Sequence, residues 1–216
     1  TLNTATLSTA TLTIGIIIIV AAYLIGSLSS AVIYCKIFKL PDPRTQGSGN
    51  PGATNVMRIA GKGAAVVVLL GDVLKGAIPV LLAKLFELNP WFIGLTALAA
   101  FLGHLYPIFF RFEGGKGVAT AVGICLALSW PFGLAVSAIW LFTVAITRVS
   151  SLGALAASGA APVLAYILID WQIAVIMILI ALLIAWKHQG NIQRLREGTE
   201  PKIGEKASSN SSSENS

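Results

Sequence analysis

Charged residues are scarce in this chain of 216 residues, because only 11% are Asp, Glu, Lys or Arg and only 9 are acidic. Hydrophobic residues make up 56%, and the mean hydropathy of +0.82 is far too high for a soluble domain of this length. A water-soluble globular fold is therefore excluded. The hydrocarbon core of a bilayer takes roughly 20 apolar residues per helix, so the chain has room for several spans.

Cysteine is also rare. The two cysteines, Cys35 and Cys125, lie within apolar stretches and far apart in the chain, which gives neither a zinc-binding spacing nor a disulfide framework. No Gly-Lys-Ser/Thr sequence follows a glycine-rich loop at the spacing of a P-loop. The sequence therefore predicts no metal site and no cofactor.

Seven apolar runs, separated by polar or Pro- and Gly-containing clusters, predict an all-α integral membrane protein with seven transmembrane helices. These runs are residues 12–34, 63–86, 91–110, 118–130, 132–146, 152–169 and 172–186. The fourth and fifth could be one kinked helix, because only Ser-Trp-Pro separates them. A single helix there would be about 43 Å long and would overshoot the hydrocarbon, so two spans are predicted.

The basic residues predict the orientation of these spans. If the N-terminus is outside and the C-terminus cytoplasmic, all but two of the 15 Lys and Arg residues are inside or at the inner surface. The exceptions are Lys75, within the second run, and Lys84. Merging the fourth and fifth runs would place Arg148 and the basic cluster at 187–206 outside, so charge favours two spans.

Three polar segments, residues 40–62, 111–117 and 187–206, reach the cytoplasmic face in this topology. One site could therefore be built from all three. Residues 1–205 are predicted to form a single seven-helix domain, and residues 206–216, which are rich in Ser, Asn and Glu, to form a disordered tail.

The first polar segment looks like a cradle for an anion. Residues 47–55 contain three glycines, two hydroxyls and two amides, so several backbone N–H groups can converge, and Arg58 offers a forked partner for phosphate oxygens. The alternative is an ordinary turn between two spans. The candidate side chains are Ser48, Asn50, Thr54, Asn55 and Arg58.

The second polar segment ends in a glycine-rich turn, residues 114–117, directly before the fourth apolar run. A helix N-terminus presents free N–H groups, and Lys116 adds a full positive charge, so a phosphate could bind there. A flexible loop with a snorkelling lysine is the alternative. His104, near the end of the third run, could react or could be a hydrogen-bonded structural residue.

The third polar segment follows the last run. His188, Asn191 and Arg194 are spaced three residues apart and would share one helical face if the span continued. The alternative for the arginines is a basic segment that binds anionic lipid headgroups.

Asp72 and Lys75 lie three residues apart within the second run, where ionisable groups are costly unless they are paired. These two residues either take part in the protein's activity or form a mutually neutralising pair that stabilises the adjacent loops.

At the three polar segments the chain resembles the bacterial acyl-phosphate-dependent glycerol-3-phosphate acyltransferases, the PlsY family. The motifs occur in the family's order and span nearly the whole chain. They are residues 47–55, Gly103-His104 with Pro107 leading into residues 114–120, and Lys187-His188 with Asn191-Ile192 and Arg194-Leu195.

The resemblance implies a seven-helix enzyme of the bacterial inner membrane with a cytoplasmic active site. Such an enzyme transfers a fatty acyl group from acyl phosphate to the 1-hydroxyl of glycerol 3-phosphate, giving lysophosphatidic acid and phosphate, the first step of phospholipid synthesis. The implied partners are glycerol 3-phosphate, fatty acyl phosphate and membrane lipid, with no nucleic acid and no obligate protein partner.

Together, the motifs and the resemblance predict two sets of site residues. The catalytic residues are Ser48, Lys116, His188 and Asn191. The substrate-binding residues are Asn50, Thr54, Asn55, Arg58, His104, Gly114, Gly115, Gly117 and Arg194. For proton removal, His188 is the usual choice of general base, but the phosphate of glycerol 3-phosphate has a second pKa near 6 and could act instead. We predict that His188 chiefly positions the substrate.

Two other function classes remain open. A transporter for phosphate-bearing solutes would explain the Asp72 and Lys75 pair, but the polar residues gather on one face instead of lining a route through the membrane. A structural membrane protein with lipid-binding loops would leave the density of Gly, Asn and His in the polar segments unexplained.

Overall fold

The computed structural model describes residues 2–203, and every regular element in that range is helical. The tail predicted at 206–216 lies outside the described residues. The helices are α1 (Leu2–Gly26), α2 (Ser30–Ile37), α3 (Ala53–Leu85), α4 (Pro90–Leu105), α5 (Val118–Leu128), α6 (Trp130–Thr147), α7 (Ser150–Leu168), α8 (Trp171–Lys187) and α9 (Gln189–Arg196), and the 3₁₀ turn η1 (Ile108–Phe110) lies between α4 and α5.

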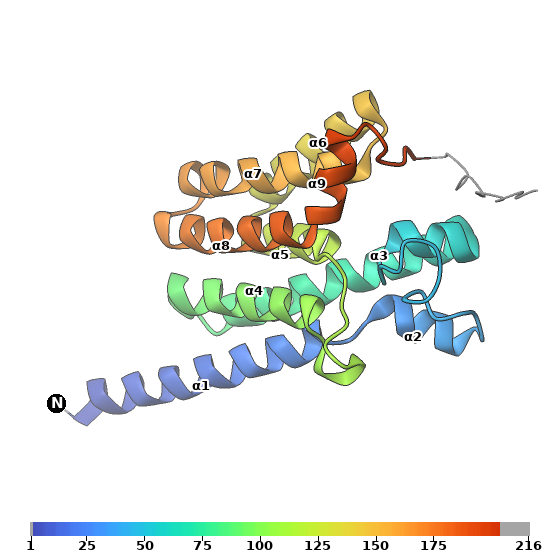
Figure 1. Ribbon diagram of the computed structural model, residues 1–216. Coiled ribbons are helices and arrows are strands. Elements are labelled where there is room, and N and C mark those ends of the chain that lie inside the picture. Colours follow the sequence, from blue (N-terminus) through green and yellow to red (C-terminus); the bar gives the residue numbers. More distant parts are fainter. Residues whose placement is uncertain (1, 204–216) are drawn as a thin grey trace, which may run out of the picture.

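The long helices lie side by side in a bundle, with the N-terminus of α1 at one end and α9 at the other (Figure 1). The main core lies between α4, α5, α6 and α8, where Phe101, Ile124, Phe132 and Met177 are at most 2% exposed. Large apolar side chains also cover the outside; Phe142, for example, is 69% exposed. An apolar exterior around an apolar core is suited to lipid.

Five helical segments are long and apolar enough to cross a bilayer, among the residues that the structure describes. They lie in α1, α3, α4 continued through η1, α6 and α7, and α8 with α9 adds a sixth if that bent pair is one span. A multi-pass α-helical membrane protein is thus confirmed. The count does not reach the predicted seven because α5 has only 11 residues and α8 only 17.

The prediction of one helix over residues 12–34 is wrong, because the helix is interrupted at residues 27–29, between α1 and α2. The Ser29 side chain caps α2 by accepting a backbone N–H. The carbonyl of Leu28, which the break removes from the helical pattern, accepts a hydrogen bond of 2.9 Å from Lys75 Nζ in α3.

Helix α3 begins at Ala53, well before the second apolar run, and bends at Gly61, where φ is 82°. Glycine adopts this positive φ without the strain that a β-carbon would bring. The part of α3 before the bend belongs to the first polar segment, for which the sequence predicted an anion cradle, with an ordinary turn as the alternative. Thr54, Asn55 and Arg58 are therefore held on a helix.

The predicted separation of the fourth and fifth runs is confirmed. Ser129 is extended, with φ −158° and ψ 128°, and it ends α5 and precedes α6. Pro131 then occupies the first turn of α6, where its missing N–H costs nothing.

Candidate active site

Asn55 organises the loop that follows α2. Its side chain is 1% exposed, and its Nδ2 donates hydrogen bonds to the carbonyls of Pro43 and Gln46 at 2.8 and 2.9 Å. Its Oδ1 accepts from the backbone N–H of Ser48 at 3.0 Å. All of these contacts are with the loop backbone, so Asn55 fixes where Ser48 lies.

The other predicted residues of this segment are more accessible. Ser48, Thr54 and Arg58 are exposed and Asn50 is half-exposed. Within the described part of the chain, none of these four side chains forms a hydrogen bond or an ion pair. Thr54 and Arg58 lie four residues apart on α3 and so share one face. Their donors are therefore available to a ligand.

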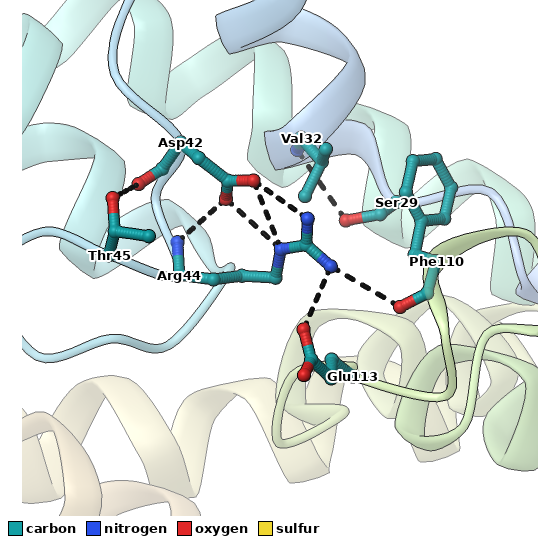
Figure 2. Close-up of polar contacts among 7 residues, drawn as sticks. All are labelled: Ser29, Val32, Asp42, Arg44, Thr45, Phe110 and Glu113. Atoms are coloured by element: carbon teal, nitrogen blue, oxygen red, sulfur yellow. Dashed lines mark hydrogen bonds and ion pairs between the residues drawn. The ribbon is translucent and has the colours of Figure 1, made fainter.

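Arg44 links the loop after α2 to the loop after α4, as Figure 2 shows. Its Nη2 contacts Asp42 Oδ2 at 2.7 Å, and its Nη1 contacts Glu113 Oε2 at 3.0 Å and the carbonyl of Phe110 at 3.3 Å. Hydrogen bonding to Arg44 lowers the pKa of Asp42, against the opposing effect of burial. Arg44 was not predicted as a site residue from the sequence, because its partners in the second loop are 66 and 69 residues away.

The glycine-rich turn at residues 114–117 packs against the last turn of α4. The N–H of Gly115 donates to the carbonyl of His104 at 3.2 Å. A β-carbon on Gly115 would overlap His104 Nε2, and Gly117 has a φ of 82°. This turn therefore needs glycine at both positions, which explains the composition on which the phosphate-site prediction rests.

His104 lies behind this turn and is 5% exposed. Its Nδ1 is 3.1 Å from Thr120 Oγ1 in α5, and its Nε2 has no hydrogen-bond partner among the described residues. The prediction that His104 binds substrate stays a prediction.

Lys116 and Asn191 bring the second and third polar segments together. Lys116 Nζ donates to Asn191 Oδ1, and Asn191 Nδ2 donates in turn to Glu200 Oε1. The same carboxylate accepts from Ser151 Oγ at 2.6 Å and from Arg194 Nε at 2.7 Å. Glu200 thus ties α7, α9 and the glycine-rich turn into one network. Glu200 was not predicted from the sequence, because a glutamate in a segment of mixed charge gives no signal of its own.

The helix breaks at His188, and α8 and α9 are bent by 62° relative to each other. The spacing of His188 and Asn191 suggested that they would share one helical face if the span continued. Because of the bend, the two residues do not lie on one straight helix. His188 is 3% exposed, and its Nδ1 is 2.8 Å from the carbonyl of Ile184. A carbonyl can only accept, so Nδ1 carries a proton and Nε2 keeps its lone pair when the ring is neutral.

Burial and hydrogen bonding shift the pKa values of this network. Burial lowers the pKa of Lys116 and that of His188, although nearby Glu200 partly opposes both shifts. Burial alone would raise the pKa of Glu200, but its hydrogen bonds with Ser151, Asn191 and Arg194 outweigh burial and lower it. Glu200 is therefore ionised at neutral pH.

The predicted residues form two groups at one end of the bundle. The loops after α2 and α4 and helix α9 all lie at the end away from the N-terminus (Figure 1). Within residues 2–203, no hydrogen bond or ion pair joins the side chains of the first-loop group, Ser48, Asn50 and Arg58, to those of the second group, Lys116, His188 and Asn191. The same range contains no group of three His, Cys, Asp or Glu residues placed to hold a metal ion.

An apolar pocket adjoins the second group. It lies between α5, α6, α7 and α8, and its space together with the open solvent at its mouth is about 410 Å³. Every lining residue except Ser158 is apolar. Val118, which follows Gly117, and Ile184, whose carbonyl faces His188, both line it. The polar network and the apolar pocket therefore adjoin each other.

Known proteins are similar in sequence to this chain over most of its length. The family model described as glycerol-3-phosphate acyltransferase matches residues 16–198. A glycerol-3-phosphate acyltransferase of Thioalkalivibrio sulfidiphilus (strain HL-EbGR7) is 53% identical over 196 residues, which are 90% of this chain and 96% of the relative. One of Francisella tularensis subsp. novicida (strain U112) is 51% identical, covering 88% of this chain and 93% of the relative.

Solved structures match the fold as well. The crystal structure of PlsY (YgiH), an integral membrane glycerol 3-phosphate acyltransferase in its glycerol 3-phosphate form, has a TM-score of 0.84 at 40% identity and covers 88% of this chain and 96% of that one. Its lysophosphatidic acid form has a TM-score of 0.82 at 39% identity, covering 88% and 95%. The family-model match, the sequence identity to the relatives and the shared helical fold lead to one conclusion: the chain belongs to the glycerol-3-phosphate acyltransferase family.

Proposed function

We propose that this chain transfers a fatty acyl group from acyl phosphate to the 1-hydroxyl of glycerol 3-phosphate, giving lysophosphatidic acid and phosphate at the first step of phospholipid synthesis. The observation that carries the proposal is the position of Lys116. Its ammonium donates to Asn191 in the polar network, and Val118, two residues further on, lines the apolar pocket. A cationic site beside an apolar pocket suits two phosphate-bearing substrates, one of which has an acyl tail.

In the proposed reaction, the 1-hydroxyl oxygen attacks the carbonyl carbon of acyl phosphate. An ester C–O bond forms, and the bond from that carbon to the bridging phosphate oxygen breaks. Inorganic phosphate leaves with the electron pair, and the hydroxyl proton passes to a base. Because phosphate is already a good leaving group, the main tasks of the site are to hold both substrates together and to balance their negative charge.

We assign the hydroxyl proton to the substrate's own phosphate. Burial lowers the pKa of His188, so its ring is neutral near pH 7 but is a weaker base than free imidazole. The phosphate of glycerol 3-phosphate has a second pKa near 6 and enters the site together with the hydroxyl. His188 then positions the substrate through hydrogen bonds at Nε2.

The other roles follow from exposure and charge. Arg58, which is exposed, and Lys116 bind the two phosphate groups. Ser48 and Asn191 complete the catalytic set, and Asn55 contributes by fixing the backbone at Ser48. The remaining substrate-binding assignments are Asn50, Thr54, Gly114, Gly115, Gly117 and Arg194; His104, which was also predicted to bind substrate, lies behind the glycine-rich turn.

We further infer seven spans, with the N-terminus outside, the C-terminus cytoplasmic, and the site on the cytoplasmic side of the bacterial inner membrane. Support comes from the basic residues, most of which lie in the loops after α2 and α4 and in α9 and its flanks. In this arrangement α5 and α8 are short spans.

Cysteine labelling tests this topology, because native Cys35 and Cys125 are buried. Thr45→Cys should be labelled only from the cytoplasmic side and Asn89→Cys only from outside; both native residues are exposed. Labelling of both positions from the same side would contradict the seven-span arrangement.

Acyl transfer and transport are separated by two assays on the same purified protein. In detergent, we expect acyl phosphate to be consumed only when glycerol 3-phosphate is present, and Lys116→Ala to abolish this consumption. In sealed vesicles, we expect no accumulation of glycerol 3-phosphate. Uptake into vesicles without acyl phosphate consumption would overturn the proposed function and favour a transporter.

A further inference from the structure

A cluster of buried polar side chains lies beneath the glycine-rich turn at residues 114–117. Asp72 and Lys75 come from α3, His104 from α4 and Thr120 from α5, and all four are at most 5% exposed. Ionisable side chains within apolar helices are costly unless they are paired. A hydrophobic residue would serve packing alone at lower cost, so this cluster needs another explanation.

The ion pair in this cluster connects three elements. Lys75 Nζ lies 2.8 Å from Asp72 Oδ1 and donates at 2.9 Å to the carbonyl of Leu28, in the break between α1 and α2. Asp72 Oδ1 in turn lies 3.8 Å from Nδ1 of His104. The pair therefore joins the α1–α2 break to the imidazole ring in α4.

His104 carries this connection to the glycine-rich turn in two ways. Its carbonyl accepts the N–H of Gly115 at 3.2 Å. Its ring edge at Nε2 faces Gly115 so closely that a β-carbon there would overlap it. Both the main chain and the ring of His104 thus define where the turn can lie.

Thr120 holds this ring by a hydrogen bond, and the Asp72 carboxylate, 3.8 Å from Nδ1 and therefore beyond hydrogen-bond distance, acts on the ring through its charge. The carboxylate near Nδ1 favours the neutral tautomer with the proton on Nδ1, which then donates to Thr120 Oγ1 at 3.1 Å. Rotating the ring by half a turn would break this hydrogen bond. The turn therefore rests on a ring held in one orientation.

We propose that Asp72, Lys75 and His104 form a positioning network that holds residues 114–117 in the shape that binds phosphate. His104 acts through Gly115 and does not touch the substrate. This inference rests on the proposed function, in which that turn binds a substrate phosphate. His104 therefore has a positioning role in place of the direct substrate contact predicted from the sequence.

Two substitutions of His104 test the contact with Gly115. Asn matches His104 at the Nδ1 position and can still bond Thr120, but it has no atom at the Nε2 position. Gln reaches toward the Nε2 position and is the matched control. We expect Gly115→Ala to raise KM for glycerol 3-phosphate about tenfold or more, because its methyl group displaces the turn.

Double variants of His104 and Gly115 then show whether His104 acts through Gly115 or contacts the substrate. We expect His104→Asn combined with Gly115→Ala to recover much of the lost affinity, because the overlap is relieved, and His104→Gln combined with Gly115→Ala to recover none. If His104 contacts substrate, the two defects are independent and their effects on KM multiply. Multiplying effects in the His104→Asn double variant would overturn the inference.

The ion pair is tested by removing both charges. Lys75→Met leaves Asp72 unpaired and should lower Tm strongly. The double variant Asp72→Asn/Lys75→Met should regain most of that Tm, yet KM should stay raised at least about threefold, because no carboxylate then favours the His104 tautomer that donates to Thr120. A double variant with both wild-type Tm and wild-type KM would show that the pair serves stability alone.

These results are distinguishable from a failure of the proposed function. A folded wild-type protein that forms no lysophosphatidic acid contradicts the function itself. If the wild type is active, the KM patterns bear only on the network. If the Asp72→Asn/Lys75→Met variant does not fold, the Gly115 and His104 variants still test the inference.

Discussion

Lys116 and Asn191 form a hydrogen bond between side chains 75 residues apart, and this bond joins the glycine-rich turn to helix α9. An ammonium has three N–H donors, so two remain for substrate oxygens while the third keeps the lysine in place. Asn191 donates in turn to Glu200, so this carboxylate also helps to determine where the Lys116 ammonium lies.

Asn191→Asp should lower kcat/KM by about tenfold to a hundredfold, because a second carboxylate would repel Glu200 and neutralise Lys116. Steady-state kinetics with both substrates varied measures this loss. The matched control is Gln189→Glu, which adds the same charge at an exposed position of α9. Equal losses in the two variants would mean that net charge alone matters.

Glu200→Gln should lower stability at neutral pH by about 1–3 kcal/mol, because hydrogen bonds to an ionised acceptor are lost. The folded-state pKa of Glu200 is lowered, so its contribution is full above the unfolded value of about 4.3 and disappears as pH falls through the folded pKa. The Tm difference between wild type and variant should therefore shrink in acid. Exposed Glu197→Gln serves as the control, and a pH-independent difference would contradict the assignment.

Arg58→Lys should reduce activity at limiting glycerol 3-phosphate although the charge is kept, because a point-like ammonium cannot form a forked pair with phosphate. Arg196→Lys makes the same exchange at an exposed position of α9. Near-wild-type KM in Arg58→Lys would remove Arg58 from the phosphate site.

Arg44→Gln should raise KM for glycerol 3-phosphate and lower Tm, because it removes the cross-link from Asp42 to Glu113 and Phe110 (Figure 2). Thermal unfolding and kinetics of the same preparation measure both effects. Arg111→Gln, an exposed residue of the second loop, should change neither. Unchanged KM in a destabilised Arg44→Gln would limit Arg44 to a structural role.

His188→Gln and His188→Asn keep donor and acceptor groups but cannot titrate near pH 7. If His188 positions substrate, at least one variant should keep a substantial part of kcat at saturating substrate. A loss of several orders of magnitude in both, with KM unchanged, would instead make His188 the general base.

The sequence predicted the features that depend on local chemistry. Hydropathy located the apolar helices. Composition located the glycine-rich turn, because its glycines and Lys116 are neighbours in the sequence. The break at residues 27–29 was missed because the apolar run continues through it. Hydropathy does not reveal that Leu28 finds its hydrogen-bond partner in Lys75.

Arg44 and Glu200 were missed for a related reason. Each acts through partners that only the fold brings close, such as Glu113 for Arg44 and Ser151 for Glu200. A single charged residue in a polar loop resembles any solvated residue. Long-range polar contacts therefore required the structure, whereas the candidate phosphate sites did not.

Acyl transfer by this chain is tested most directly by following the oxygen that bridges carbonyl and phosphate in acyl phosphate. With ¹⁸O at that position and unlabelled glycerol 3-phosphate, the purified protein should release ¹⁸O-phosphate and unlabelled lysophosphatidic acid in equal amounts, because attack occurs at the carbonyl carbon. Label retained in fatty acid, or phosphate released without lysophosphatidic acid, would contradict acyl transfer by this chain.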